Sequence, residues 1–188
     1  MRPSPVPTPP GPTPIETSRL TLRAPDSSDL DALVTGLDDP AVARMLSRVP
    51  HPYGPAEAEA FLALASSGNA GGQCLFLAID LNGTLIGGIG LHGLPEVEDF
   101  GYWLARPYWG KGYASEAAAA VLGHAFQTLG VDRVLSGAFV DNPGSLRVQD
   151  KLGFERVGTS MRYSLARGAT VEHVDTVLTR ARFAELAQ

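Results

Sequence analysis

Residues 106–126 read RPYWGKGYASEAAAAVLGHAF, a loop with two glycines that runs directly into an alanine-rich helix. Gly110 and Gly112 let the backbone turn tightly and let a ligand approach it closely. The alanines at residues 117–120 favour a helix, and the free N–H groups of its first turn point back into the loop. Such a helix terminus attracts anions, and Lys111 adds a full positive charge. The stretch therefore predicts a binding site for phosphate or pyrophosphate.

Two other phosphate-binding patterns can be set aside. The nucleotide-binding P-loop needs G-x-x-x-x-G-K-[ST], but Gly112 follows Lys111 here and Ala105 stands where the first glycine should be. A dinucleotide fingerprint does occur by pattern at residues 88–93, GIGLHG. It is followed by Leu94 and Pro95, so the helix that would hold the pyrophosphate is missing. We interpret this pattern as a coincidence, and a nicotinamide-dependent oxidoreductase is the weakest hypothesis.

Composition indicates a globular protein of 188 residues with a net charge of −5, which argues against nucleic acid as a partner. No apolar run approaches the ~20 residues of a membrane span, and a signal-peptide core is missing, so we expect a cytoplasmic protein without a membrane partner. Residues 1–14 contain seven prolines and predict a disordered tail, which leaves residues 15–186 as a single domain. The histidines show no metal-ligand spacing and are each expected in packing or at the surface: His51, His92, His124 and His173.

Periodicity and turn residues predict an alternation of strands and helices. We expect helices at residues 26–37, 40–48, 55–65, 113–126 and 143–152, and strands at residues 19–23, 73–81, 84–91, 98–106, 133–140, 154–165 and 169–181. Asn82 and Gly83 form the strongest hairpin signal, and Asn142 followed by Pro143 is a good helix start. This order predicts a mixed α/β (α+β) fold in one layered domain.

Three segments in this order resemble the GCN5-related N-acetyltransferase (GNAT) family, and within it the ribosomal-protein N-terminal acetyltransferases. The segments are SRLTLR at residues 18–23, GYWLARPYWGKGYASE at residues 101–116, and NPGSLRVQDKLGF at residues 142–154. The resemblance covers roughly residues 17–186. It implies the GNAT fold, with a mixed, mostly antiparallel central sheet flanked by helices.

The resemblance also implies acetyl-CoA as co-substrate and no metal. The family's pyrophosphate loop reads [Q/R]-x-x-G-x-[G/A], and Trp109 replaces the polar first residue here, as is usual in the ribosomal-type branch. The residues expected at the cofactor are Leu104, Arg106, Trp109, Gly110, Lys111, Gly112, Tyr113, Ala114, Ser115, Asn142 and Ser145.

The chemistry that the family implies is direct attack of a neutral amine on the acetyl thioester, without an acyl-enzyme. A backbone N–H at residues 103–105 would stabilise the oxyanion, where the family splays two strands apart. Many members carry a tyrosine as general acid where Gln149 stands, so the acid would be Ser145, directly or through water. Asp99 or Glu98 would act as base, through water. As alternatives, Ser145 is only a first-turn helix residue and Asp99 a solvated carboxylate.

The acceptor is the least specified partner. The resemblance implies a primary amine, either a protein N-terminus or a small molecule, and residues 26–67 with the last hairpin carry no readable code for it. A non-catalytic acyl-CoA-binding sensor of the same fold is the rival hypothesis, since the usual tyrosine is missing. A homodimer is an open alternative for the assembly.

Overall fold

The computed structural model describes residues 11–97 and 99–186. The first ten residues of the predicted tail lie outside this range, and residues 11–14 form no regular structure. The assignment of residues 15–186 to a single domain stays a prediction. The strands are β1 (Ile15–Glu16), β2 (Thr21–Arg23), β3 (Cys74–Leu81), β4 (Thr84–His92), β5 (Asp99–Leu104), β6 (Arg133–Phe139), β7 (Glu155–Ser164) and β8 (Ala169–Thr179). The helices are the 3₁₀ helices η1 (Ser27–Asp29) and η2 (Arg106–Tyr108), and α1 (Leu30–Leu37), α2 (Pro40–Ala43), α3 (Pro55–Ala70), α4 (Tyr113–Gln127), α5 (Pro143–Leu152) and α6 (Arg180–Leu186).

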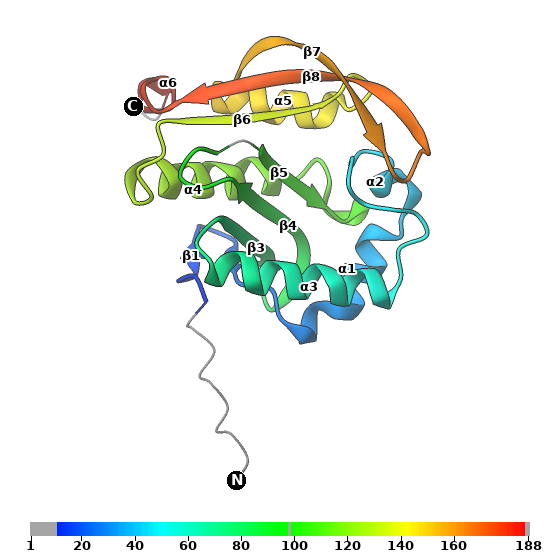
Figure 1. Ribbon diagram of the computed structural model, residues 1–188. Helices are drawn as coiled ribbons and strands as arrows, with labels where there is room; N and C mark the ends of the chain where they lie inside the picture. The colour runs from blue at the N-terminus through cyan, green and yellow to red at the C-terminus, as the bar shows by residue number, and fades with distance from the viewer. Residues whose placement is uncertain (1–10, 98, 187–188) are drawn as a thin grey trace.

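The strands form two antiparallel sheets that meet edge to edge (Figure 1). One sheet has the order β1-β2-β3-β4-β5 and the other has the order β6-β8-β7. They are joined where Val97, just before β5, forms a parallel bridge with Val134 of β6. The predicted α/β architecture, mostly antiparallel and flanked by helices, is therefore confirmed.

Strand β3 shows why helices cover both faces of the larger sheet. Its sequence CLFLAIDL has no polar alternation, and its six middle residues are all buried. Helices α1 and α3 pack on one face, where Leu33 of α1 shares a cluster with Ala78 and Leu85 of the sheet. Helix α4 packs on the other face, against Leu77 and Ile79. The connection to β4 is a tight turn in which Asn82 and Gly83 both have positive φ, 54° and 82°, as the hairpin signal predicts.

Several predicted boundaries are wrong. The strand expected from residue 19 begins at Thr21, the helix expected at residues 55–65 continues to Ala70, and the strand expected to reach residue 106 ends at Leu104. The helix expected at residues 40–48 ends at Ala43, because Met45 and Leu46 donate to carbonyls three residues back and the chain leaves as a tight turn. The strand expected at residues 169–181 ends at Thr179, where the unpredicted helix α6 begins. The hydroxyl of Thr179 accepts a hydrogen bond from the Arg182 N–H, which caps that helix.

The feature that matters most for function is the divergence of β5 and β6 after their single bridge. Ala105 donates to Ile86 of β4, so the alternating ladder turns the N–H groups of Tyr102 and Leu104 away from β4, toward β6. By the same alternation, the Val140 bond to Glu172 leaves the N–H groups of residues 137 and 139 facing β5. Among the described residues, Leu135 to Val97 is the one backbone hydrogen bond across this boundary. Beyond it the strands splay apart and leave a gap.

Candidate active site

The phosphate loop, residues 109–115, has the geometry that its glycines predict. Gly110 and Gly112 adopt positive φ values of 74° and 84°, which favour glycine. Gly112 is the N-cap of α4 and provides no side-chain cap, and the first helical bond runs from Glu116 N–H to the Gly112 carbonyl, at 3.1 Å. The N–H groups of residues 113–115 are therefore left for an anion.

A cavity of about 590 Å³, the first cavity, lies beside this loop and reaches the start of α5. Of the predicted cofactor residues, those that line it are Leu104, Trp109, Gly110, Gly112, Tyr113, Ala114, Ser115, Asn142 and Ser145. Two others do not line it. Arg106 begins η2, and the Lys111 ammonium lies 5.7 Å from the centre of the Tyr108 ring. Their contact with a cofactor stays a prediction.

Two further cations line the first cavity that the sequence reasoning missed, Arg147 and Lys151. They lie four residues apart on α5 and so on one face of the helix. The amide oxygen of Asn142 accepts a hydrogen bond from Ser145 N–H at 3.1 Å, which caps α5 as predicted. The signal available in the sequence was the i, i+4 spacing of two basic residues after a strong N-cap.

Trp109, which replaces the polar first residue of the family's pyrophosphate loop, has a structural role. Its indole Nε1 donates to the Leu104 carbonyl at 2.7 Å, which ties the phosphate loop to the end of β5. The Leu104 carbonyl faces away from β4 together with the Leu104 N–H, as the ladder requires. The loop is thus anchored next to the backbone donor that faces the gap.

Glu116 holds the other side of the phosphate loop. Its carboxylate accepts from the hydroxyls of Thr17 and Ser18, at 2.7 and 3.0 Å, and forms an ion pair with Arg19 at 2.6 Å. Arg19 in turn donates to the Lys111 carbonyl at 3.1 Å. Burial alone would raise the pKa of Glu116, but these hydrogen bonds outweigh it and lower the pKa. The SRLTLR segment therefore fixes the loop from outside.

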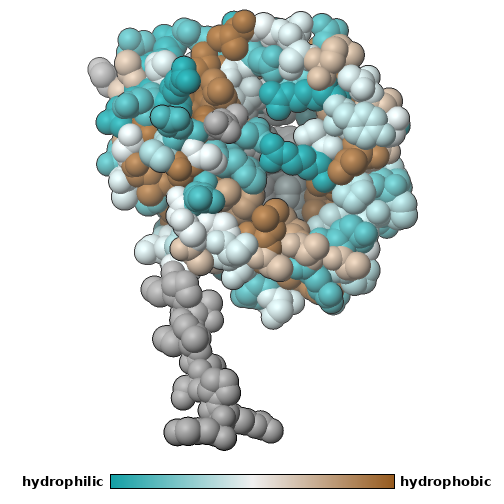
Figure 2. Space-filling model, viewed as in Figure 1, coloured by the Kyte–Doolittle hydropathy of each residue, from teal (hydrophilic) through white to brown (hydrophobic). Residues whose placement is uncertain are grey.

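A smaller cavity of about 120 Å³, the second cavity, adjoins the first at the gap between β5 and β6. It is lined from β5 by Asp99 and Tyr102, from β7 by Arg162, from β8 by His173, and by residues 45–47. The face opposite α4 and α5 is hollowed between the two sheets, and hydrophilic side chains border the hollow (Figure 2). Tyr102, Ser145 and Asn142 line both cavities, so the two spaces meet there.

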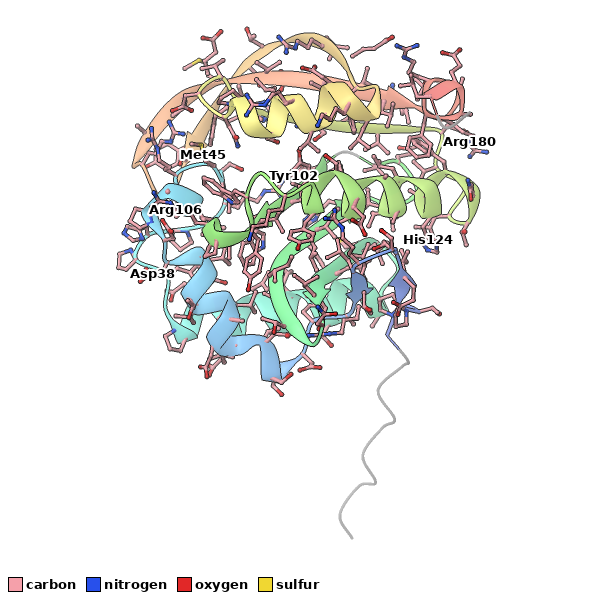
Figure 3. The ribbon with its side chains drawn as sticks, turned by 180° about the vertical axis from the view of Figure 1, so that it is seen from behind. Asp38, Met45, Tyr102, Arg106, His124 and Arg180 are labelled. Carbon is pink, nitrogen blue, oxygen red and sulfur yellow. The ribbon has the colours of Figure 1, made fainter. Side chains whose placement is uncertain are left out.

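Tyr102 and Ser145 form the centre of a hydrogen-bond chain at this junction. Figure 3 shows Tyr102 between α4 and α5. Its hydroxyl lies 2.9 Å from Ser145 Oγ and donates to the Ser145 carbonyl at 3.2 Å. Burial raises the pKa of Tyr102 to about 12, although its contacts with Ser145 and Gln149 act in the opposite direction. The phenol therefore stays protonated and can donate.

Gln149 of α5, which stands where many family members have a tyrosine, contacts this junction of the two cavities. It is buried, donates to the Gly137 carbonyl at 3.0 Å, and accepts from the Thr176 hydroxyl at 2.7 Å. Its amide nitrogen also lies 3.4 Å from Ser145 Oγ. Gln149 thus holds Ser145 rather than acting as an acid itself.

The predicted bases have different positions. Asp99 lies at the rim of the second cavity with its side chain 31% exposed, in an ion pair with Arg48 at 2.7 Å. Glu98 lies outside the described residues.

Within the described ranges no helix is long and apolar enough to cross a membrane. The same ranges hold no group of three His, Cys, Asp or Glu side chains arranged for a metal ion.

Comparisons with known proteins agree with this geometry. A family model for the acetyltransferase (GNAT) domain matches residues 19–155. An uncharacterized N-acetyltransferase p20 from Bacillus licheniformis is 27% identical over 161 residues, which cover 83% of this chain and 90% of that relative.

Two solved structures share the fold. The structure of Mycobacterium smegmatis RimJ in complex with CoA-disulfide superposes with a TM-score of 0.81 at 21% identity, and the match covers 94% of this chain and 90% of that one. The ribosomal-protein-S5-alanine acetyltransferase from Vibrio fischeri gives a TM-score of 0.78 at 18% identity, covering 92% and 99%. At these identities the likeness concerns the fold alone.

Proposed function

The chain belongs to the GNAT acetyltransferase family, and from this membership we propose that it transfers an acetyl group from acetyl-CoA to a primary amine by direct attack. The observation that carries the proposal is the junction of the two cavities at Tyr102 and Ser145. One cavity has an anion-binding helix terminus and the other has acidic and basic side chains, so cofactor and acceptor would meet from opposite sides. Such a meeting needs no acyl-enzyme.

The first cavity suits the cofactor in shape and charge. The uncapped N-terminus of α4 and the glycine backbone of the phosphate loop would hold the pyrophosphate. Arg147 and Lys151 would contribute positive charge from α5. The thioester that acetyl-CoA supplies would lie at the gap, where the Leu104 N–H is available to its carbonyl oxygen.

Ser145 and Tyr102 together would supply the proton for the leaving thiolate. Their hydroxyls are 2.9 Å apart, so either can protonate sulfur while the other replenishes it. This assignment keeps Ser145 as the predicted acid and adds Tyr102, which was not among the predicted catalytic residues. The absence of a tyrosine at Gln149 therefore does not remove the acid.

Asp99 would attract the acceptor as a cationic ammonium at the mouth of the second cavity. Its carboxylate also forms an ion pair with Arg48 at 2.7 Å. We propose a small-molecule amine or the terminal residue of a peptide as acceptor, since its amine would enter a second cavity of only about 120 Å³.

The test is release of free CoA thiol from acetyl-CoA over a panel of amines, amino acids and peptides. We expect turnover with at least one class, and initial-rate lines that intersect as a ternary complex requires. Tight acetyl-CoA binding by calorimetry without thiol release from any amine would favour the sensor hypothesis. Parallel initial-rate lines would contradict direct attack.

A further inference from the structure

We propose that His173 is the residue that takes the proton from the acceptor amine, and that Asp175 positions it. The inference rests on the proposed function and assigns a task that the sequence reasoning gave to Asp99 or Glu98. It places a base inside the second cavity, opposite the hydroxyls of Tyr102 and Ser145.

The imidazole of His173 has a fixed position at the second cavity. His173 lies in the middle of β8, paired with Phe139 of β6 and Ser160 of β7, and lines the second cavity. Its ring packs edge-on against Phe139 with 5.9 Å between ring centres. A Cβ at position 137 would collide with the ring, so glycine there gives the imidazole its place. The ring is thus fixed at the splayed end of β6.

The two ring nitrogens of His173 have different surroundings. Nδ1 lies 2.9 Å from Asp175 Oδ1, two residues along the same strand face. Burial raises the pKa of Asp175, but hydrogen bonds from Ser160 and His173 outweigh it, so the carboxylate is ionised and accepts from Nδ1–H. This bond assigns the lone pair of the neutral imidazole to Nε2.

Nε2 is the nitrogen that the cavity can reach. No hydrogen bond to Nε2 occurs within the described residues, although His173 is only 7% exposed. In the same part of the chain, every side-chain nitrogen or oxygen that is shielded from solvent has a hydrogen-bond partner. Because Nε2 has no partner there, it is not shielded from solvent. The space that His173 lines, and that Nε2 can therefore reach, is the second cavity.

Several charged side chains act on the imidazole of His173. Burial lowers the pKa of His173 and outweighs the effect of Asp175, while Arg162 lowers it and Asp99 raises it. Arg162 pairs with Asp175 at 3.2 Å, and Asp99, the third charge that acts on the ring, pairs with Arg48 at 2.7 Å. The imidazole is therefore neutral near pH 7 and free to accept a proton.

The proton balance of the step closes without another reactant. Nε2 takes one proton from the ammonium, and the freed lone pair forms the N–C bond to the thioester carbon. As the C–S bond breaks, the thiolate takes a proton from the Tyr102–Ser145 pair, which recovers one from the nitrogen. The products are the N-acetyl amine, CoA thiol and an imidazolium that returns its proton to solvent.

The test uses the full chain with His173→Asn, whose amide still reaches Asp175 but has no basic nitrogen, and with the best amine from the panel. We expect kcat/KM for the amine to fall about 10²-fold near pH 7, with the loss shrinking at high pH as free amine becomes abundant. The acetyl-CoA affinity should stay unchanged. His173→Gln serves as a second variant if the first one fails to fold.

The matched control is His92→Asn, because His92 is also partly buried with a lowered pKa but does not line the second cavity. We expect it to keep the wild-type pH profile. Asp175→Asn should move the acid limb of kcat/KM to lower pH, since the carboxylate raises the pKa of His173. A packing role for His173 predicts a loss of equal size at every pH, and that result overturns the inference. If the unchanged chain consumes no amine, the proposed function falls and takes this inference with it.

Discussion

Gly112 is the residue where backbone conformation and ligand binding can be separated. At its φ of 84°, an alanine would be less stable than glycine by about 1 kcal/mol. The new Cβ would project from the phosphate loop and lie 3.4 Å from Nη2 of Arg19. We expect Gly112→Ala to weaken acetyl-CoA binding more than tenfold by calorimetry, because the methyl group enters the path of the phosphate.

The control for this change is Gly130→Ala, at a turn with a φ of 72° and nothing within 4 Å of the added Cβ. It carries the same backbone cost without touching the phosphate loop. If both variants lose the same affinity, or neither does, the phosphate does not approach Gly112.

Tyr102 and Ser145 should lose activity as a unit. We expect Ser145→Ala and Tyr102→Phe each to lower kcat by about 10²-fold, with acetyl-CoA affinity nearly constant, since the proton is needed only in the transition state. Because the two hydroxyls lie 2.9 Å apart and share one proton path, the double variant should lose less than the product of the two effects. Independent, multiplicative losses in rapid-quench kinetics would assign them separate tasks.

Among single residues, the sequence predicted those that act on chain segments close to them in sequence. Gly110, Gly112 and Asn142 act through their own backbone and the next turn of helix, so short patterns reveal them. Tyr102 and Ser145 are 43 residues apart, and His173 reaches the site only because β8 lies beside β6. No local pattern contains that information, although His173-x-Asp175 on one strand face was a visible hint.

Among the contacts between elements, the connection of the N-terminal segment to α4 depends most on a single side chain. Glu116 is 16% exposed and is the shared acceptor for Thr17, Ser18 and Arg19. We expect Glu116→Gln to lower the free energy of unfolding by about 2 kcal/mol, since the charge-assisted bonds are lost and Arg19 keeps an unpaired charge. In a chain of 188 residues this corresponds to a drop in Tm of roughly 4–8 °C.

The reference variant is Glu185→Gln, which removes an exposed ion pair to Arg182 on α6 and should leave Tm unchanged. Acetyl-CoA affinity should also fall in Glu116→Gln, because Arg19 holds the Lys111 carbonyl. If Glu116→Gln left Tm unchanged, the N-terminal segment would not depend on the Glu116 carboxylate.

Elements were predictable where the chain's own pattern sets them. The Asn82–Gly83 turn, the buried run of β3 and the Asn142–Pro143 helix start all follow from local chemistry. The missed elements depend on distant contacts. Residues 44–48 leave the helical path where Leu165 N–H binds the Ser47 carbonyl and Arg167 binds the Arg44 carbonyl, both from the last hairpin. Phe183 of α6 packs on Phe126 of α4.

For the whole molecule, two histidines that are at least partly buried contribute to the pH dependence of stability. Burial lowers the pKa of both His92 and His173, so the fold favours their neutral forms. Below the unfolded value of about 6.5 the unfolded chain takes up protons that the fold resists. The contribution of the two histidines to stability is therefore complete above about pH 6.5 and is lost as pH falls through their lowered pKa values in the folded state.

We expect Tm to decline between about pH 6.5 and 5, a window that lies above the titration of most carboxylates. The double variant His92→Asn/His173→Asn should show a flatter curve in this window, from a lower starting value. An unchanged slope would assign the decline to other groups.

The divergence of β5 and β6 also has a consequence for the backbone itself. The N–H groups of Tyr102, Leu104, Gly137 and Phe139 face an unfilled seam in the middle of the protein rather than a neighbouring strand. Their amide protons should exchange with deuterated solvent far faster than those of β3, although they sit at the molecule's centre. An extended ligand in the seam would supply the missing partners, so its arrival should slow exchange at these positions first. We therefore expect the slowly exchanging amides of the free protein to form two separate groups, one in each sheet, which bound cofactor would join.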